Sequence, residues 1–406
     1  RVDRRQRQMC IRDRLVTASY SSAQNSISEK YYDVSQKLIA ESLKDSTVFD
    51  RLSELVDRFP ARISGSENLE KAIDWIVLEM KKDGFDAVYT QPVMVPKWVR
   101  GNEYCEITSP VSKRIPMVGL GGSIATPKKG ITSEVIVFKT IAELKENIGK
   151  VKGKIVLINQ EFESYGKTVA IRSQSAVEAA KGGAKAALIR SVASFSMQTP
   201  HTGTMRYDDA VEKIPTAAIS TEDAAWIDRT IQRGGKVTLK LYMEARFEKE
   251  SLSRNIVAEL KGSEKPDEIV VMGGHIDSWD VGQGAMDDAG GCVVSWEALR
   301  LLKKLNIKPK RTIRAVFWTN EENGLRGGQA YGDSAKAASE NHVAAIESDA
   351  GVFRAKGFGF GGKEENMPVL KEIAKLLASI DADGMTMGGG GADIGPLMRE
   401  GVPGFG

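Results

Sequence analysis

The sequence predicts an α/β fold: a mostly parallel mixed sheet flanked by helices, with an α+β domain inserted into it. From Asn255 onward, short apolar runs typical of strands alternate with amphipathic helical segments. A helix able to cover such a sheet lies far ahead of these strands, at residues 69–80. The segment between them has strand and helix patterns of its own, so we expect an insertion.

Length and composition agree with a globular protein of about two domains. The chain has 406 residues, of which 41% are hydrophobic and 27% charged. No apolar run approaches the roughly 18 residues that a membrane-spanning helix needs, so no membrane span is expected.

The charge surplus of the chain is local. The net charge is +3, but residues 1–14 contain six Arg and two Asp, which leaves the rest at about −1. This balance removes the electrostatic case for a nucleic-acid partner. Residues 8–14 read like a translated sequencing adapter, so we expect 1–14 to be an artefact, with a disordered basic arm as the alternative. The native amino terminus is then missing, and no signal peptide can be read.

Three further segments complete the predicted organisation. Residues 15–114 form the first part of the main domain, 115–245 the insertion, and 246–406 the second part of the main domain. The helix at 69–80 carries one apolar stripe, and Ser64 with Glu67 could form a capping box at its start. Apart from Cys10, only Cys105 and Cys292 are present, which supports neither a disulfide framework nor a cysteine metal site.

The insertion contains short β-prone runs and two helical segments. The strands are expected at 134–138, 154–159, 186–190, 215–219 and 237–242, and the helices at 168–181 and 222–232. Its one histidine, His201, could stabilise a loop at the surface or contact a substrate at the domain interface.

Polar residues follow three of the apolar runs after Asn255. His275 follows 268–273, Glu321 and Glu322 follow 312–318, and Asp349 follows 343–346. Open α/β sheets place their ligands at the carboxyl ends of parallel strands, so we expect these side chains to converge. One imidazole with several carboxylates is a ligand set suited to Zn²⁺.

The neighbouring residues suggest how the site is arranged. Asp277 could fix the tautomer of His275 through its carboxylate. Asp287 and Asp288 precede a helix whose apolar face includes Cys292, which we expect to be buried. Of the adjacent Glu321 and Glu322, one could bind metal while the other accepts a proton from water. His342 lies in a polar run and is predicted to face solvent.

These motifs resemble those of the co-catalytic dizinc exopeptidases. The resemblance rests on the pattern His275-x-Asp277, Gly284-x-x-Asp287-Asp288-x-x-Gly291, Glu321-Glu322-x-Gly324 and Asp349, and extends from about residue 30 to the end. It implies that the insertion is a protease-associated domain. It also implies two Zn²⁺ ions, bridged by Asp287. His275 and Asp349 would complete one zinc, Glu322 would bind the other, Glu321 would be the general base, and Asp277 would orient His275.

The last ligand of that family is a histidine beyond the segment matched by residues 401–404. No histidine follows Asp349 here, so we expect a truncated carboxyl end, an incomplete second zinc position and weak or no hydrolysis of dipeptides by this chain. The resemblance further implies short peptide substrates, dipeptides with free termini above all, a secreted or lysosomal location, and compatibility with a homodimer. The alternatives are a non-catalytic relative that keeps the fold, and an aminopeptidase or amidohydrolase of the same fold.

Overall fold

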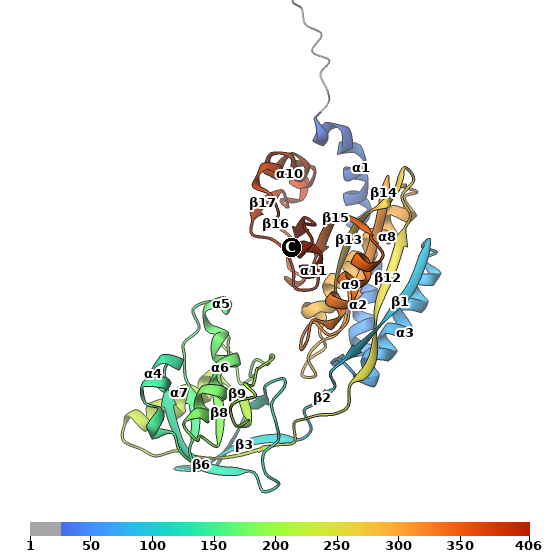
Figure 1. The fold of residues 1–406 in the computed structure, drawn as a ribbon. Coiled ribbons are helices and arrows are strands. Elements are labelled where there is room, and N and C mark those ends of the chain that lie inside the picture. The colour runs from blue at the N-terminus through green and yellow to red at the C-terminus, as the bar shows by residue number, and fades with distance from the viewer. Residues whose placement is uncertain (1–25) are drawn as a thin grey trace, which may run out of the picture.

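The computed structural model describes residues 26–406, so the segment 1–14 lies outside the described residues. The chain forms two lobes (Figure 1). The first lobe contains residues from both ends of the described chain, and the second is inserted between its strands β1 and β12. Within residues 26–406, no helix is long and apolar enough to cross a membrane.

The first lobe is built on an eight-stranded mixed sheet, which confirms the predicted α/β class. Its central strands β14, β13, β15 and β18 are parallel to one another, and antiparallel pairs occur nearer the edges. In spatial order the strands are β1 (Ala87–Val95), β12 (Ser251–Leu260), β14 (Arg311–Trp318), β13 (Lys265–His275), β15 (Asn341–Glu347), β18 (Gly404–Phe405), β16 (Gly357–Gly361) and β17 (Gly384–Met387).

Helices cover both faces of this sheet. They are α1 (Ile27–Ser42), α2 (Thr47–Arg58), α3 (Glu67–Lys82), α8 (Gly290–Lys304), α9 (Arg326–Ala337), α10 (Met367–Ala374) and α11 (Gly395–Arg399), with shorter turns η2 (Ala285–Ala289), η3 (Glu364–Asn366) and η4 (Lys375–Ile380). Alternate residues of β14 enter different cores: Phe317 packs with α2, α3 and α8, whereas Trp318 packs with α9 and α11. Because both faces are buried, the strand reads as a continuous apolar run.

Helix α3 has the predicted apolar stripe but a different cap. Ile73 and Ile76 are fully buried against the sheet. The side chain of Ser66, not Ser64, caps the helix by accepting a hydrogen bond from the amide of Leu69, at 3.2 Å. The expected capping box between Ser64 and Glu67 is therefore wrong, because the hydroxyl of Ser64 is engaged elsewhere in the protein.

The second lobe is the expected inserted α+β domain. Its eight-stranded sheet has the order β4 (Lys113–Ile115), β3 (Glu103–Ser109), β10 (Thr238–Met243), β6 (Ile131–Phe138), β7 (Ile155–Ile158), β8 (Ala186–Arg190), β9 (Thr216–Ile219) and β5 (Met117–Gly119). Its helices are α4 (Ile141–Glu146), η1 (Ile148–Lys150), α5 (Tyr165–Thr168), α6 (Ala170–Lys181) and α7 (Thr221–Gln232). Strand β3 begins ahead of residue 115, where we expected the insertion to start.

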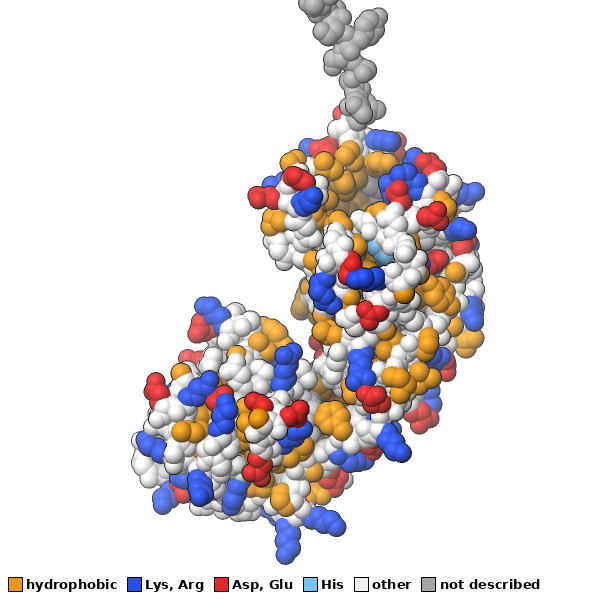
Figure 2. Space-filling view, in the orientation of Figure 1, with side chains coloured by type: hydrophobic (Ala, Val, Ile, Leu, Met, Phe, Trp, Pro, Cys, Tyr) orange, Lys and Arg blue, Asp and Glu red, His pale blue; other side chains and the backbone are white. Residues whose placement is uncertain are grey.

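The lobes are joined by two chain crossings and by side-chain contacts. A two-stranded ribbon of β2 (Trp98–Val99) and β11 (Arg246–Phe247) accompanies the crossings. Arg100 donates two hydrogen bonds to the carboxylate of Asp280, at 2.9 and 2.6 Å. A space-filling view shows a deep notch between the lobes, with side chains of both charges intermixed on the visible face (Figure 2). Cys105 and Cys292 are both buried free thiols, as expected for Cys292.

His342 is buried, not solvent-facing as predicted. It lies within β15, and its Nε2 is 2.8 Å from the hydroxyl of Tyr331 on α9. Burial lowers the pKa of His342 to about 4, since the charged form loses its hydration. The polar neighbours in the sequence concealed that helix α9 packs over this end of the strand.

We predict that His342 makes the folded state less stable in mild acid. Between pH 6.5 and about 4 the unfolded chain binds a proton at His342 that the folded chain does not, so the free energy of unfolding falls as the pH falls. Urea unfolding of His342→Gln should show a smaller loss of stability between pH 7 and pH 5 than the wild type. Equal losses in the two proteins would contradict this account.

Candidate metal centre

The centre lies at the carboxyl ends of three neighbouring parallel strands. His275 ends β13 and is paired in register with Trp318 at the end of β14, while Gly273 is paired with Glu347 at the end of β15. The segments that follow β14 and β15 carry Glu321, Glu322 and Asp349. The sheet therefore delivers the expected residues to one edge.

His275 is the buried focus of the cluster. Its side chain is 1% exposed, and its Nδ1 lies 3.0 Å from the backbone carbonyl oxygen of Asp277. Its Nε2 lies 3.0 Å from Asp287 Oδ1, 3.4 Å from Asp349 Oδ1 and 4.0 Å from Glu321 Oε2. Among residues 26–406, this buried Nε2 has no partner with hydrogen-bond geometry.

This arrangement fits a bound metal ion. One ligand atom from each of His275, Asp287 and Asp349 lies within 4.8 Å of the others. Two Zn²⁺ bonds of about 2 Å span at most about 4 Å, which is enough for the 3.0 and 3.4 Å that separate His275 Nε2 from Asp287 and Asp349. An imidazole that is held through one nitrogen by a carbonyl and directs the other at carboxylates has the environment of a metal-ligating histidine.

Asp288 links the two chain segments that carry His275 and Asp287. Its carboxylate is fully buried and accepts hydrogen bonds from the amides of His275, at 3.1 Å, and Gly291, at 3.0 Å. Glycine is required at position 274, because a Cβ there would lie 2.1 Å from Asp288 Oδ2. Asp288 is thus a structural residue beneath the cluster, whereas Asp287 points into it.

The carboxylate of Asp277 holds the turn that carries Glu321 and Glu322. It accepts hydrogen bonds from the amides of Glu321, at 3.0 Å, and Glu322, at 3.4 Å. The hydroxyl of Ser64 donates to the same carboxylate at 3.0 Å and accepts from the side chain of Asn320 at 3.1 Å. We expected this carboxylate to contact His275, but it lies 3.8 Å from His275 Nδ1. The backbone carbonyl of Asp277 makes that contact instead.

Burial and crowding shift the pKa values of these groups. Burial raises the pKa of Glu321 to about 7, and nearby carboxylates add to the effect. Burial, followed by the charge of Asp287, raises the pKa of Glu322 well above its ordinary range. Burial alone would lower the pKa of His275, but the nearby carboxylates of Asp287 and Asp349 outweigh it and raise that pKa. The cluster of acidic groups around one imidazole therefore favours the binding of a cation.

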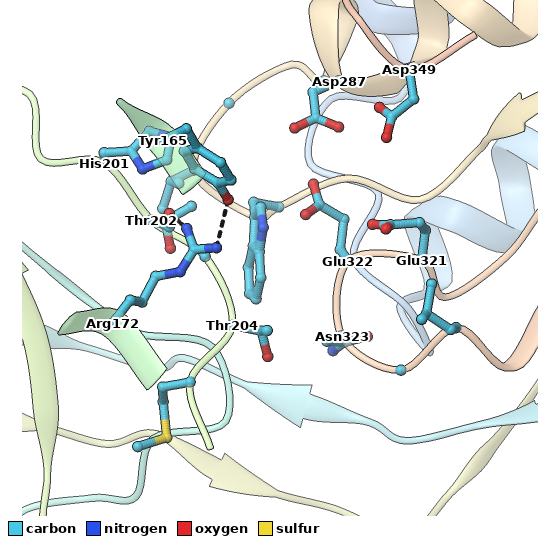
Figure 3. Close-up of a pocket in the computed structure, with 18 of the residues that line it drawn as sticks. Tyr165, Arg172, His201, Thr202, Thr204, Asp287, Glu321, Glu322, Asn323 and Asp349 are labelled. Carbon is cyan, nitrogen blue, oxygen red and sulfur yellow. Dashed lines mark hydrogen bonds between the residues drawn. The ribbon is translucent and has the colours of Figure 1, made fainter. Parts of the chain in front are cut away.

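The cluster opens into a cavity of about 860 Å³ between the two lobes. Figure 3 shows Asp287, Asp349, Glu321 and Glu322 on one side of it, and Tyr165, Arg172, His201 and Thr202 of the inserted lobe on the other. Of the two alternatives for His201, its position in this cavity favours contact with a substrate.

Arg172, which lines this cavity from the inserted lobe together with Arg206, is a cationic residue that sequence reasoning missed. It is 8% exposed, and its guanidinium donates to the carbonyl oxygen of Thr202, at 2.9 Å, and to the hydroxyl of Tyr165, at 2.7 Å. Gly203 leaves room for it, because a Cβ at that glycine would lie 1.8 Å from Arg172 Nη1. In the sequence, Arg172 is an ordinary residue of a predicted helix, and only the folding of the insertion over the site reveals it.

Comparisons with known protein families agree with both lobes. The model of peptidase family M28 matches residues 255–406, and that of the PA domain matches residues 108–227. These matches confirm the expected protease-associated insertion. A metal-ligand cluster at the edge of an α/β sheet, with a PA domain opposite, defines a metallopeptidase.

Individual relatives give a narrower result. The chain is 46% identical over 356 residues to carboxypeptidase Q from Homo sapiens, which covers 88% of this chain and 75% of that protein. It is 45% identical over 378 residues to carboxypeptidase Q from Xenopus laevis, covering 91% of this chain and 81% of that protein. The chain therefore belongs to peptidase family M28, a zinc-dependent family, and is a metallo-exopeptidase similar to carboxypeptidase Q.

Solved structures share the architecture. A peptidase M28 precursor from Shewanella amazonensis has a TM-score of 0.87 at 35% identity, covering 92% of this chain and 86% of that chain. A zinc aminopeptidase from Bacillus subtilis has a TM-score of 0.65 at 22% identity, covering 88% of this chain and 84% of that chain. The second likeness shows a common fold.

We predict that Zn²⁺ raises the melting temperature of the chelator-treated protein, because an ion that binds only the folded state stabilises it. His275→Ala should abolish this zinc-dependent rise, since it removes the buried imidazole of the cluster. His201→Ala should retain the rise, because His201 lines the same cavity outside the cluster. Calorimetry with and without zinc provides the measurement, and an equal rise in all three proteins would place the ion elsewhere.

Proposed function

We propose that this chain is a dizinc exopeptidase that hydrolyses short peptides, chiefly dipeptides with free termini, with Glu321 as the general base. The observation that carries the proposal is the buried Nε2 of His275, which has no hydrogen-bond partner within residues 26–406. It faces Asp287 and Asp349, beside Glu321, in a cavity whose opposite wall bears Arg172. Family membership supports the reaction class.

The proposed ligands divide between two zinc positions. His275, Asp287 and Asp349 would hold one ion, and Asp287 and Glu322 would hold the other. This chain thus supplies three ligands to the first position and two to the second. Catalytic zinc sites usually have three protein ligands, so the first ion should be held more tightly.

Proton transfer is the proposed role of Glu321. Zinc, when bound, supplies Lewis-acid activation of water and of the peptide carbonyl. Glu321 would accept the proton of the attacking water and then donate it to the nitrogen of the leaving amine. The hydrogen bond from its backbone amide to Asp277 fixes the turn from which this side chain extends.

The inserted lobe would recognise the free carboxylate of the peptide. Arg172 is fixed by Tyr165 and Thr202 and faces the cluster across the cavity (Figure 3). A guanidinium pairs well with a carboxylate, and a cation on the wall opposite the metal position favours short substrates that span the cavity. A secreted or lysosomal location and a homodimer are parts of this proposal that rest on the resemblance alone.

A substrate panel tests the proposal. Zinc-loaded protein should hydrolyse unblocked dipeptides faster than dipeptides with an acetylated amino end, an amidated carboxyl end, or a non-peptide amide. Preference for amidated or long peptides cleaved from the amino end would indicate an aminopeptidase instead. Hydrolysis of non-peptide amides alone would indicate an amidohydrolase.

We predict that Glu321→Gln lowers kcat by about 10²- to 10⁴-fold while zinc content is unchanged, because it removes a base without removing a ligand. Glu322→Gln is the matched control on the neighbouring residue and should weaken the second zinc position. Metal analysis and steady-state kinetics on both variants provide the measurement. Loss of zinc from Glu321→Gln would reverse the two assignments.

We predict that Arg172→Met raises KM for an unblocked dipeptide by about 10- to 100-fold, the cost of one charge-assisted hydrogen bond. The same dipeptide with an amidated carboxyl end is the control, and its kcat/KM should be nearly the same in the variant and the wild type. If both substrates are affected equally, Arg172 does not bind the carboxylate.

A further inference from the structure

A single loop, residues 276–284, joins the two proposed metal ligands His275 and Asp287. It follows β13 directly and ends just before the turn η2. It has little regular structure, so its path depends on the groups that hold it. The separation of the imidazole of His275 from the carboxylate of Asp287 depends on that path.

The guanidinium of Arg62 binds both ends of this loop. Arg62 is fully buried, between α2 and α3 in the sequence. Its Nε donates to the carbonyl oxygen of Ile276 at 2.9 Å, its Nη1 to that of Gln283 at 2.7 Å, and its Nη2 to that of Gly284 at 2.9 Å. Ile276 is adjacent to His275, and Gly284 lies a few residues before Asp287. One rigid planar group therefore spans the loop from one ligand to the other.

The main chain around Arg62 reinforces this contact. Its amide donates to the hydroxyl of Ser278 at 3.0 Å, and the amide of Ser278 donates to the carbonyl oxygen of Arg62 at 3.1 Å. Gly284 has φ of 59°, and a Cβ there would lie 2.4 Å from Ser278 Cβ and 2.8 Å from Arg62 Nη2. Glycine is thus required by the left-handed backbone and by the side chains of Ser278 and Arg62 beside it.

The charge of Arg62 has no direct ion pair within residues 26–406, where its side-chain bonds go to carbonyl oxygens. Asp277 and Asp288, both fully buried, are the anions that act on it at longer range. Burying a guanidinium costs desolvation free energy, and here its donors bind only backbone oxygens. The benefit that offsets this cost is the fixed path of the loop. Lysine could not replace Arg62, because an ammonium has no planar fork with which to bind three separated carbonyls.

We propose that Arg62 is a positioning residue that presets the spacing of His275 and Asp287 for zinc. The inference rests on the proposed metal site and adds to it a group that touches neither the ion nor the substrate. Groups that orient metal ligands typically contribute about 10- to 100-fold to metal affinity. We expect a contribution of the same size from Arg62 to the zinc affinity of this site.

Zinc affinity of the chelator-treated chain, measured by competition with a fluorescent chelator, tests this role. Arg62→Met should raise the Kd for Zn²⁺ by about 10- to 100-fold. Arg314→Met is the matched control. Arg314 is also buried, at 6% exposure, but it lies in the first half of β14, away from the end that leads to Glu321, and bonds Glu259, Glu340 and Tyr331. It should lower the melting temperature of the metal-free protein and leave the Kd within about threefold.

Chemical rescue separates positioning from general stability. Arg62→Ala leaves a space for a free guanidinium ion, and millimolar methylguanidinium should restore part of its zinc affinity, with no effect on Arg314→Met. If the Met and Ala variants fail to fold, Arg62→Lys and Gly284→Ala decide, and both should weaken zinc binding. A folded Arg62 or Gly284 variant with wild-type Kd overturns the inference. A wild-type chain that binds no zinc overturns the proposed function itself.

Discussion

The concentration of negative charge at the edge of a buried sheet is the constraint on which the rest of the structure depends. Asp287, Asp349 and Glu321 all approach the buried Nε2 of His275. Carboxylates this close repel one another, most strongly where they are buried: the side chain of Glu321 is 21% exposed and that of Asp287 65%. Their chain segments do not move apart, because hydrogen bonds hold each one. Rigid backbone support keeps the site open for a cation.

That support comes from polar groups that never enter the cavity. Asp288 holds the amide of His275, and Asp277 holds the turn of Glu321 and Glu322. Both carboxylates are fully buried, and burial raises the pKa of each. Adjacent acidic residues therefore have different tasks: Asp287 faces the cavity, while Asp288 serves the scaffold. In the same way, Asp277 supports the backbone, while Asp349 lines the cavity.

The sequence predicted the site better than its support. His275, Glu321, Glu322 and Asp349 could be expected to converge because they follow apolar strands that end at one edge, whereas Asp287 was assigned from the family resemblance. The bond of Ser64 to Asp277 joins positions far apart in the chain, and local patterns suggested only a helix cap. The prediction that His342 faces solvent was wrong for the same reason. Its neighbours in sequence are polar, but its neighbours in space are Tyr331 and the rest of α9.

Two arginines show why tertiary context decides the role of a side chain. Arg62 donates hydrogen bonds to backbone carbonyls within the first lobe, whereas Arg172 lines the cavity from the second lobe. Neither stands out in the sequence.

The loop 276–284 connects their environments. Arg62 holds its two ends, and Asp280 within it is bound by Arg100 at the root of the insertion. Trp279 packs on Gly121 of the inserted lobe, where a Cβ would lie 1.8 Å from its ring. One short loop thus contacts the scaffold of the metal ligands on one side and the inserted lobe on the other. The segment between the proposed ligands therefore also contributes to the contact between the two lobes whose residues line the cavity.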